Sequence, residues 1–413
     1  MSAGSPTIKL GFMESIPTRV KLLILTQLLN TLGFGYFMIY LSGYLVEVNV
    51  LDASGVGIIF GFESLVMIAA GIPLGILSDK RERRWFLILG NLLLPPMMLI
   101  FALTNDFSLF LVAALLAGLG EAASLSSWNA IIADQTDTGN RDAAFSLSFI
   151  VSNVGISAGL ALPLAMPVIE GASGMSSAQV HSGTLLLIGV ACIFVPLALW
   201  ALLRNYHEKP KPEEKAEDAS DLRMLLKFSG MNGLIGLGAG LIIPLMATWL
   251  LYKFSVSNTY SGPYLALSGL TIAFAAVGSS RLSKRFGLFR AILMTAGSST
   301  VFMFSMAFIP NLFLAGGVYI IRSSLMNMAS PLMDSYLMGI IRPGRRGLAS
   351  AISAIVWRLP NSLSTILGGF ILEAGHQTGN HFLYDVPWLG AVAFYVAGIV
   401  LLYVNFRNVK TRG

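Results

Sequence analysis

The sequence predicts an all-α membrane protein with about twelve transmembrane helices in two six-helix bundles. Three observations predict this fold: the composition, a series of long apolar segments, and an internal repeat. Of the 413 residues, 55% are hydrophobic and only 12% are charged. The mean hydropathy of +0.73 lies far above that of a water-soluble chain of this length, so a lipid bilayer is the expected solvent.

The apolar segments are long enough to cross a membrane as helices. A helix needs about 20 apolar residues to span roughly 30 Å of hydrocarbon. The segments that meet this length lie approximately at 20–46, 55–78, 85–104, 108–134, 143–168, 183–203, 224–252, 260–282, 290–310, 312–340, 348–372 and 388–406. The first segment is too long for a signal-peptide core and lacks a small-residue cleavage site, so we expect a retained helix.

The positive charges alternate strongly between the two sides of this predicted bundle. Of the 27 Lys and Arg residues, 24 fall at the termini, in the loops after even-numbered segments or in the central linker. By the positive-inside rule, we expect both termini in the cytoplasm of a plasma-membrane protein. The sequence pI of about 9.4 therefore indicates topology and anionic lipid contacts, and no nucleic-acid motif accompanies it.

An internal repeat divides the chain in two at the polar stretch "RNYHEKPKPEEKAED" (204–218). A shift of 205 residues aligns "LGFG" (32–35) with "LGAG" (237–240) and Arg141 with Arg346, without any gap. Two parallel halves with a site between them near the midplane are typical of secondary transporters. The predicted parts are a cytoplasmic N-terminus (1–17), an N-terminal bundle (18–204), a linker (205–222), a C-terminal bundle (223–406) and a cytoplasmic C-terminus (407–413).

The charged stretch "GILSDKRERR" (75–84), between the second and third apolar segments, resembles the cytoplasmic signature of the major facilitator superfamily. That signature runs Gly, three residues, Asp, a basic residue and then two further basic residues. The residues that match it are Gly75, Asp79, Lys80, Arg83 and Arg84. An "R-x-x-A" turn beginning at Arg141 enters the fifth segment, as in that family.

The resemblance implies a monomeric secondary transporter that works by alternating access, with no cofactor. It also implies a conformational latch that stabilises the outward-facing state. In that latch, Gly75 permits close helix approach, Asp79 caps the N-terminus of the eleventh helix near Leu348, and the basic residues hold the carboxylate of Asp134. The alternative is that the basic residues only fix the topology.

Four ionisable residues lie well inside the apolar segments: Glu63, Glu121, Arg322 and Arg358. A central charge costs roughly 2.5 to 3.5 kcal/mol on insertion scales, so these side chains must face water, the protein interior or one another. The acids belong to the N-terminal half and the bases to the C-terminal half. We therefore predict ion pairs across the central site, either as switches or as static helix contacts.

Each charge type suggests a role in transport. Loss of water favours the protonated form of a carboxylic acid, which makes Glu63 and Glu121 the candidate proton sites. Arginine stays charged, so Arg322 and Arg358 are candidate counter-charges or binders of anionic groups. Other predicted site residues, for which ordinary packing is the alternative, are Asn153, Trp128 and Trp357.

No phosphate-binding loop, nucleophile elbow or zinc motif occurs in the sequence, and the segment 373–385 is expected to be a solvated outer loop without a metal. We therefore expect no enzyme. We expect export of a small organic molecule coupled to protons, the direction resting on likeness to small efflux members. One alternative is a proton-independent organic-anion exchanger or uniporter using Arg322 and Arg358. Another is a lipid-handling or sensor protein on the same scaffold.

Overall fold

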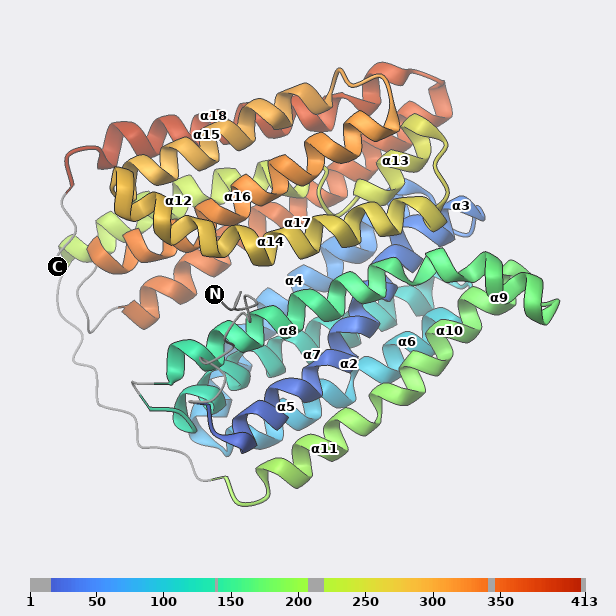
Figure 1. The fold of residues 1–413 in the computed structure, drawn as a ribbon, viewed down its shortest axis with the longest axis horizontal. Helices are drawn as coiled ribbons and strands as arrows, with labels where there is room; N and C mark the ends of the chain where they lie inside the picture. The colour runs from blue at the N-terminus through green and yellow to red at the C-terminus, as the bar shows by residue number, and fades with distance from the viewer. Residues whose placement is uncertain (1–15, 138–139, 207–218, 341–345, 410–413) are drawn as a thin grey trace, which may run out of the picture.

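The structure, a computed structural model, describes residues 16–137, 140–206, 219–340 and 346–409. Within its helices, side chains are not described at 79–80, 126, 142, 219–223, 272–277, 280, 338–339 and 346–351. The described residues form helices joined by short turns and contain no strand (Figure 1).

Six membrane passes come from residues 16–206, which we call the N half. Their helices are α2 (Thr18–Ile39), η1 (Tyr40–Tyr44), α3 (Leu45–Glu47), α4 (Ala53–Lys80), α5 (Arg83–Leu92), α6 (Leu94–Leu103), α7 (Phe107–Asp134), α8 (Arg141–Ala161), η2 (Leu162–Ala165), α9 (Met166–Ser173), α10 (Ser177–Cys192) and α11 (Phe194–Leu203). Several passes consist of two or more consecutive helices, and η1 is a π-helical stretch inside the first pass.

Six further passes come from residues 219–409, which we call the C half. Their helices are α12 (Ala219–Gly240), α13 (Met246–Phe254), α14 (Asn258–Phe286), α15 (Leu288–Met306), α16 (Leu312–Ile340), α17 (Arg346–Thr378), η4 (His381–Tyr384) and α18 (Val386–Phe406). Ten of the described passes are long and apolar enough to span a membrane by length and composition. The predicted all-α membrane fold is therefore confirmed.

Local sequence signals explain several helix starts. Asp52 accepts a hydrogen bond from the Gly55 amide (2.6 Å) and caps α4, while Asp106 caps α7 in the same way. Ser176 and Gln179 form a capping box at the start of α10. The helices begin and end within six residues of the predicted segments. The largest differences are at α10, which begins at Ser177, and at α17, which continues to Thr378 through part of the predicted outer loop. Helix α12 begins at Ala219, inside the predicted linker.

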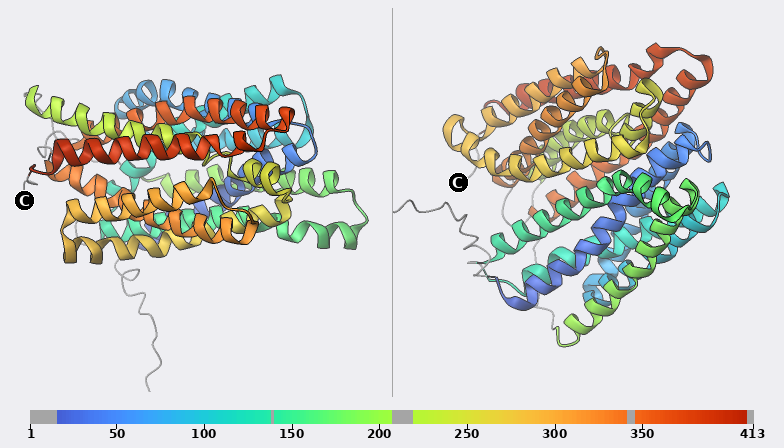
Figure 2. Two further views of the ribbon diagram at one scale, coloured as in Figure 1. Left: turned by 90° about the horizontal axis from the view of Figure 1, so that it is seen from above. Right: turned by 45° about the vertical axis from the view of Figure 1, so that its right-hand side comes forward.

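The two halves lie side by side and meet along a pair of faces (Figures 1 and 2). Across this interface, α4 packs on α17 and α8 packs on α14. One end of the bundle carries Thr18, Lys80, Asp134 and Phe406, near the ends of the described chain, and we call it the terminal end. The opposite end carries the turns after α3, α6, α9 and α13, and we call it the distal end.

Candidate functional site

At the distal end, the interface between the halves is closed by direct backbone contact. A Cβ atom added at Gly57 of α4 would lie 2.8 Å from the Thr365 carbonyl oxygen of α17, and one at Gly369 would lie 2.5 Å from the Ala53 oxygen. A Cβ at Gly262 of α14 would lie 2.3 Å from the Leu160 oxygen. Glycine is therefore required here because the helix backbones touch.

Towards the terminal end, the same helix α4 loses this contact. A Cβ added at Gly71 or Gly75 would meet no described atom within 4 Å. No described atom therefore approaches Gly75 closely, and the neighbour expected there, the start of α17 near Leu348, has side chains outside the described residues. Among the described residues, the backbone contact between α4 and α17 therefore lies in the distal part of α4 and is not found at Gly71 or Gly75.

A cavity of about 670 Å³ lies in the C half, walled by α12, α16, α17 and α18. Its ionisable lining residues are Arg322, Asp334, Arg358 and Tyr395. The rest of its wall combines amide and hydroxyl side chains with apolar and aromatic ones, among them Asn327 and Trp357. A cavity of this size and mixed lining is suited to a small organic molecule.

An ion pair joins the two halves at the edge of this cavity. Glu121 projects from α7 of the N half, and its Oε1 atom lies 2.8 Å from Nη2 of Arg358 on α17 of the C half. The side chains of Arg358 and Glu121 are 29% and 40% exposed, so water reaches the pair. Nη1 of Arg358 also lies 3.5 Å from the sulfur of Met67 on α4. The predicted contact between an N-half acid and a C-half base therefore forms.

Glu63 lies on α4 and is only 8% exposed. Its backbone faces Gly118 of α7, where an added Cβ would lie 2.4 Å from the Glu63 carbonyl oxygen. Among the described residues, none forms a hydrogen bond or ion pair with the Glu63 carboxyl group. The charges of Glu121 and Arg358 act on it from nearby, so the three residues form one electrostatic group.

Arg322 is the most enclosed of the four charges, with 4% of its surface exposed. Nη2 donates a hydrogen bond to the Tyr395 hydroxyl (3.0 Å), and the guanidinium carbon lies 5.7 Å from the centre of the Tyr395 ring. Its Nε atom has no hydrogen-bond acceptor. In the described part of the chain, no carboxylate lies within 4 Å of this guanidinium.

Three uncharged residues were predicted to line the site, and only Trp357 does so. Trp128 instead donates from Nε1 to Ser148 (3.1 Å) and packs among apolar side chains of the N half. Asn153 donates to the Phe149 carbonyl oxygen of its own helix (2.8 Å) and is absent from the cavity wall. In this conformation these two residues make local contacts within the N half, and their role at the site stays a prediction.

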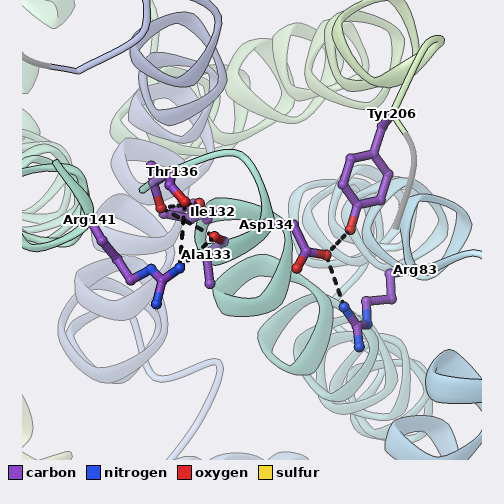
Figure 3. Close-up of polar contacts among 7 residues, drawn as sticks. All are labelled: Arg83, Ile132, Ala133, Asp134, Thr136, Arg141 and Tyr206. Atoms are coloured by element: carbon purple, nitrogen blue, oxygen red, sulfur yellow. Dashed lines mark hydrogen bonds and ion pairs between the residues drawn. The ribbon is translucent and has the colours of Figure 1, made fainter. Parts of the chain in front are cut away.

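The terminal end of the N half carries a second charged cluster (Figure 3). Nη1 of Arg83 lies 3.0 Å from Oδ2 of Asp134, with the two side chains 6% and 14% exposed, and the Tyr206 hydroxyl donates to the same carboxylate oxygen. The resemblance implied this contact between the basic loop and Asp134. It joins α5 to α7 within one half.

The other predicted latch residues differ in their contacts. Arg141 donates to the carbonyl oxygens of Ala133 (3.3 Å) and Thr136 (3.5 Å), as Figure 3 shows. Arg84 pairs with Glu82 at 2.5 Å and donates to a carbonyl oxygen at the end of α11. The side chains of Asp79 and Lys80 lie outside the described residues, as do those around Leu348.

Sequence reasoning missed several polar contacts of the site region. Tyr395 was not singled out because a tyrosine in an apolar segment carries no distinctive pattern. Glu47 and Glu373 accept hydrogen bonds from backbone amides across the interface at the distal end. The sequence does not reveal these contacts, because a backbone amide is present at almost every residue and so marks no partner. Glu373 was placed in a solvated loop, but the longer α17 buries it to 8% exposure.

With the fold and site in place, comparison with known proteins identifies the class. Residues 23–365 match the Major Facilitator Superfamily, so the chain belongs to this family of membrane transporters. The multidrug resistance protein MdtG of Proteus mirabilis is 21% identical over 389 residues, covering 91% of this chain and 92% of that protein. The uncharacterised MFS-type transporter YceJ of Bacillus subtilis is 24% identical, over 41% of this chain and 40% of that protein.

Solved structures show the same fold at low sequence identity. A bacterial homologue of the human lysosomal transporter Spinster, in an inward-facing and occupied conformation, superposes with a TM-score of 0.72 at 17% identity, over 93% of this chain and 94% of that one. An auto-inhibited peptide transporter of the POT family gives 0.74 at 14% identity, over 96% and 98%. The chain is therefore an integral membrane protein of the transporter class.

Proposed function

We propose that this protein is a secondary active transporter that moves a small organic molecule across the plasma membrane by alternating access, coupled to protons. The observation that carries the proposal is the ion pair between Glu121 and Arg358. It joins the two halves at the wall of the cavity, and it contains a group that a proton neutralises. A contact of this kind links occupancy of the cavity to the relative position of the halves.

The distribution of Lys and Arg favours a cytoplasmic terminal end, with both termini inside the cell. With that orientation, the closed distal interface faces outward and the part of α4 that carries Gly71 and Gly75 faces the cytoplasm. The structure would then represent the inward-facing state. The likeness to an inward-facing Spinster homologue supports this assignment.

The coupling step follows from the charges of the pair. Protonation of Glu121 removes its attraction for Arg358, which frees both the interface and the guanidinium. Glu63 is buried beside the pair, no described residue donates a hydrogen bond to its carboxyl group, and an unpaired ionised carboxylate is costly at such a position. We therefore assign Glu121 as the coupling acid and Glu63 as a second site for the proton.

The conformational latch is proposed in a modified form. Arg83 and Asp134 pair in this conformation, so their contact braces α5 and α7 in a state other than the outward-facing one. The switching element of the latch is then Asp79, which would cap the start of α17 when the terminal end closes. Asp79→Asn is expected to lower the outward-facing population.

Export is the proposed direction, because one relative that aligns along nearly the whole chain is named as a multidrug resistance protein. The function is proposed for a monomer, as membership of this family implies.

The test uses purified protein in sealed liposomes with a pH-sensitive dye inside, screened against cationic, neutral and anionic compounds. We expect a substrate-dependent proton flux that disappears in Glu121→Gln. Glu170→Gln is the matched control, because Glu170 lies in α9 at the distal end, away from the cavity. Proton flux that survives in Glu121→Gln would contradict the assignment of the coupling acid.

A second candidate function is organic-anion exchange without protons, favoured by the unpaired guanidinium of Arg322. It predicts that Glu121→Gln spares exchange of an organic anion between the two sides of the membrane, with no dye signal. For Arg322 and Arg358 to bind one anion together, Arg358 would have to leave Glu121, with which it is paired in this conformation.

A further inference from the structure

Arg322 is a permanent positive charge enclosed in the protein, and no described carboxylate lies within 4 Å of its guanidinium. The residue is 4% exposed, and among the described residues its Nη2 atom donates to the neutral Tyr395 hydroxyl while its Nε atom has no acceptor. Arginine cannot release its proton in a protein. Burying an unpaired ion costs several kcal/mol, so a group of opposite charge is expected to occupy this position at some stage of the cycle.

The acidic residues of the cavity region do not supply this charge. Asp334 is on the same helix, but twelve residues along α16 correspond to a rise of about 18 Å. Glu121 is already paired with Arg358. Glu63 belongs to α4 of the other half and lies beside that pair. In this conformation the counter-charge for the Arg322 guanidinium is therefore expected to come from a ligand.

The donors around Arg322 converge in a way that suits an oxyanion. Nε carries one free hydrogen, and Nη2 has two hydrogens, of which the Tyr395 hydroxyl accepts one. The hydroxyl hydrogen of Tyr395 takes part in no hydrogen bond between described residues. Two parallel guanidinium donors and a phenol match a carboxylate, sulfonate or phosphonate group, which binds arginine through two oxygens.

The rest of the cavity wall defines the body of the ligand. Met326, Met333 and Leu337 provide apolar surface, and Trp357 provides an aromatic one, while asparagine and serine side chains supply a few neutral polar groups. The volume of about 670 Å³ holds a molecule of one or two rings beside the charged group.

We infer that Arg322 and Tyr395 form the subsite for the anionic group of an amphipathic organic anion, whose apolar body lies along α16 and α17. This inference names a substrate class for the proposed transporter. Calling the bound anion a substrate rests on the proposed function, whereas the binding itself does not. Binding can be measured without a membrane gradient, so the two ideas can fail separately.

The test compares four probes that share one ring system: 2-naphthoate, 2-naphthalenesulfonate, neutral 2-naphthamide and cationic 2-naphthylmethylamine. Affinities are measured by calorimetry on the purified full-length protein in lipid nanodiscs. We expect at least one of the anions to bind roughly tenfold or more tightly than the amide, as for charge-assisted hydrogen bonds. The amine should bind more weakly still.

Variants assign the preference to the subsite. Arg322→Gln should lose the anion preference, and Tyr395→Phe, which keeps the ring, should lose part of it. Arg322→Lys keeps the charge without the two parallel donors, so it should still prefer anions to the amide. If Arg322→Gln does not fold, the other two variants decide. Equal binding of anions and amide to the native protein, or an unchanged preference in both Arg322→Gln and Tyr395→Phe, overturns the inference.

A separate observation concerns the distal end, where two carboxylates cross the interface to bind helix N-termini. Oε2 of Glu47, from the N half, accepts from the backbone amide (2.8 Å) and side-chain amide (2.9 Å) of Asn258 at the start of α14. Oε2 of Glu373, from the C half, accepts from the amide of Ala53 (3.2 Å) at the start of α4.

The two helix N-termini bound in this way occupy equivalent places in the repeat, although the acids that bind them, Glu47 in α3 and Glu373 in α17, do not. Ala53 and Asn258 are each the first residue of a long helix, α4 and α14, and their numbers differ by 205, the offset of the internal repeat. Each helix N-terminus carries partial positive charge and free amides, which a carboxylate stabilises. Tyr252 (2.9 Å) and Gln377 (3.0 Å) hold the Glu373 carboxylate in position.

We propose that Glu47 and Glu373 act as a reciprocal pair of clamps that hold the distal end closed. Each clamp must break when the halves separate there. The test is a spin-label distance measurement between Leu103 and Phe308, exposed residues near the distal end of the two halves, after replacement of the single buried Cys192 by serine.

Neutralising either clamp as Glu47→Gln or Glu373→Gln should increase the population with a long distal distance, by on the order of tenfold. Glu170→Gln is the control, because Glu170 is also near the distal end and forms no hydrogen bond across the interface through its carboxylate in the described structure. Unchanged distance distributions in both clamp variants would overturn the proposal, and so would an equal shift in the control.

Discussion

The two ends of the interface between the halves are held in different ways. At the distal end, α4 touches α17 through glycine backbones, and carboxylates of each half bind helix N-termini of the other. At the terminal end, the described charges of the N half pair within that half, as Arg83 does with Asp134. The distal contacts therefore depend on the conformational state, whereas the terminal cluster of the N half stabilises one bundle by itself.

The largest effect is expected from breaking the terminal cluster. Arg83→Met leaves the Asp134 carboxylate enclosed without its charged partner, which should cost roughly 3 kcal/mol of folding free energy. The apparent melting temperature of the purified protein should fall, while the distal distance stays the same. Arg81→Met, at an exposed position of the same loop, is the control. A native melting temperature in Arg83→Met would show that the cluster adds no stability.

An intermediate effect is expected from two glycines of the same helix. In Gly57→Leu the added side chain meets the α17 backbone and destabilises the state in which the distal end is closed. The free energy of that state relative to the open one should rise by about 1 to 3 kcal/mol, a roughly 5- to 150-fold change in population. Gly75→Leu meets no described atom in this state and should hinder closure of the terminal end instead. Distances measured across both ends should therefore show that Gly57→Leu favours the state open at the distal end, and that Gly75→Leu favours the state open at the terminal end. If both variants favour the same state, the comparison is contradicted.

The smallest effect is expected from a single hydrogen bond between the halves. Thr248 of α13 donates from its hydroxyl to the carbonyl oxygen of Ser42 (2.6 Å), inside the π-helical stretch of the first pass. Thr248→Val keeps the shape and should favour opening of the distal end by about 1 kcal/mol. Thr300→Val is the matched control, because the Thr300 hydroxyl binds its own helix. Equal populations in the two variants would mean that this bond does not hold the interface.

The sequence predicted the fold well because hydrophobic length and the 205-residue offset are properties of the chain itself. It also predicted that N-half acids would face C-half bases, since lone charges inside a bilayer must find partners. Which acid pairs with which base depends on how each helix is rotated and tilted, and one sequence does not fix this. Glu121 reaches Arg358, while Glu63 on the neighbouring helix stays enclosed.

The repeat was a weaker guide to side-chain roles. Asn153 occupies the repeat position of Arg358, yet its short side chain binds the carbonyl oxygen one turn back on its own helix. Arg358 is long enough to reach the other half. An equivalent backbone position therefore predicts an equivalent place in the fold, and the length and charge of the side chain decide what it contacts.

The pair of Glu121 and Arg358 has a thermodynamic consequence that holds whatever the cargo is. If neutralising Glu121 lowers the affinity of the two halves for each other by some factor, then separating the halves must raise the affinity of Glu121 for a proton by the same factor. In the proposed mechanism, this one contact would couple protonation to the position of the halves without a separate sensor for acidity. The contact that reports the conformation would also set the proton affinity on each side of the membrane.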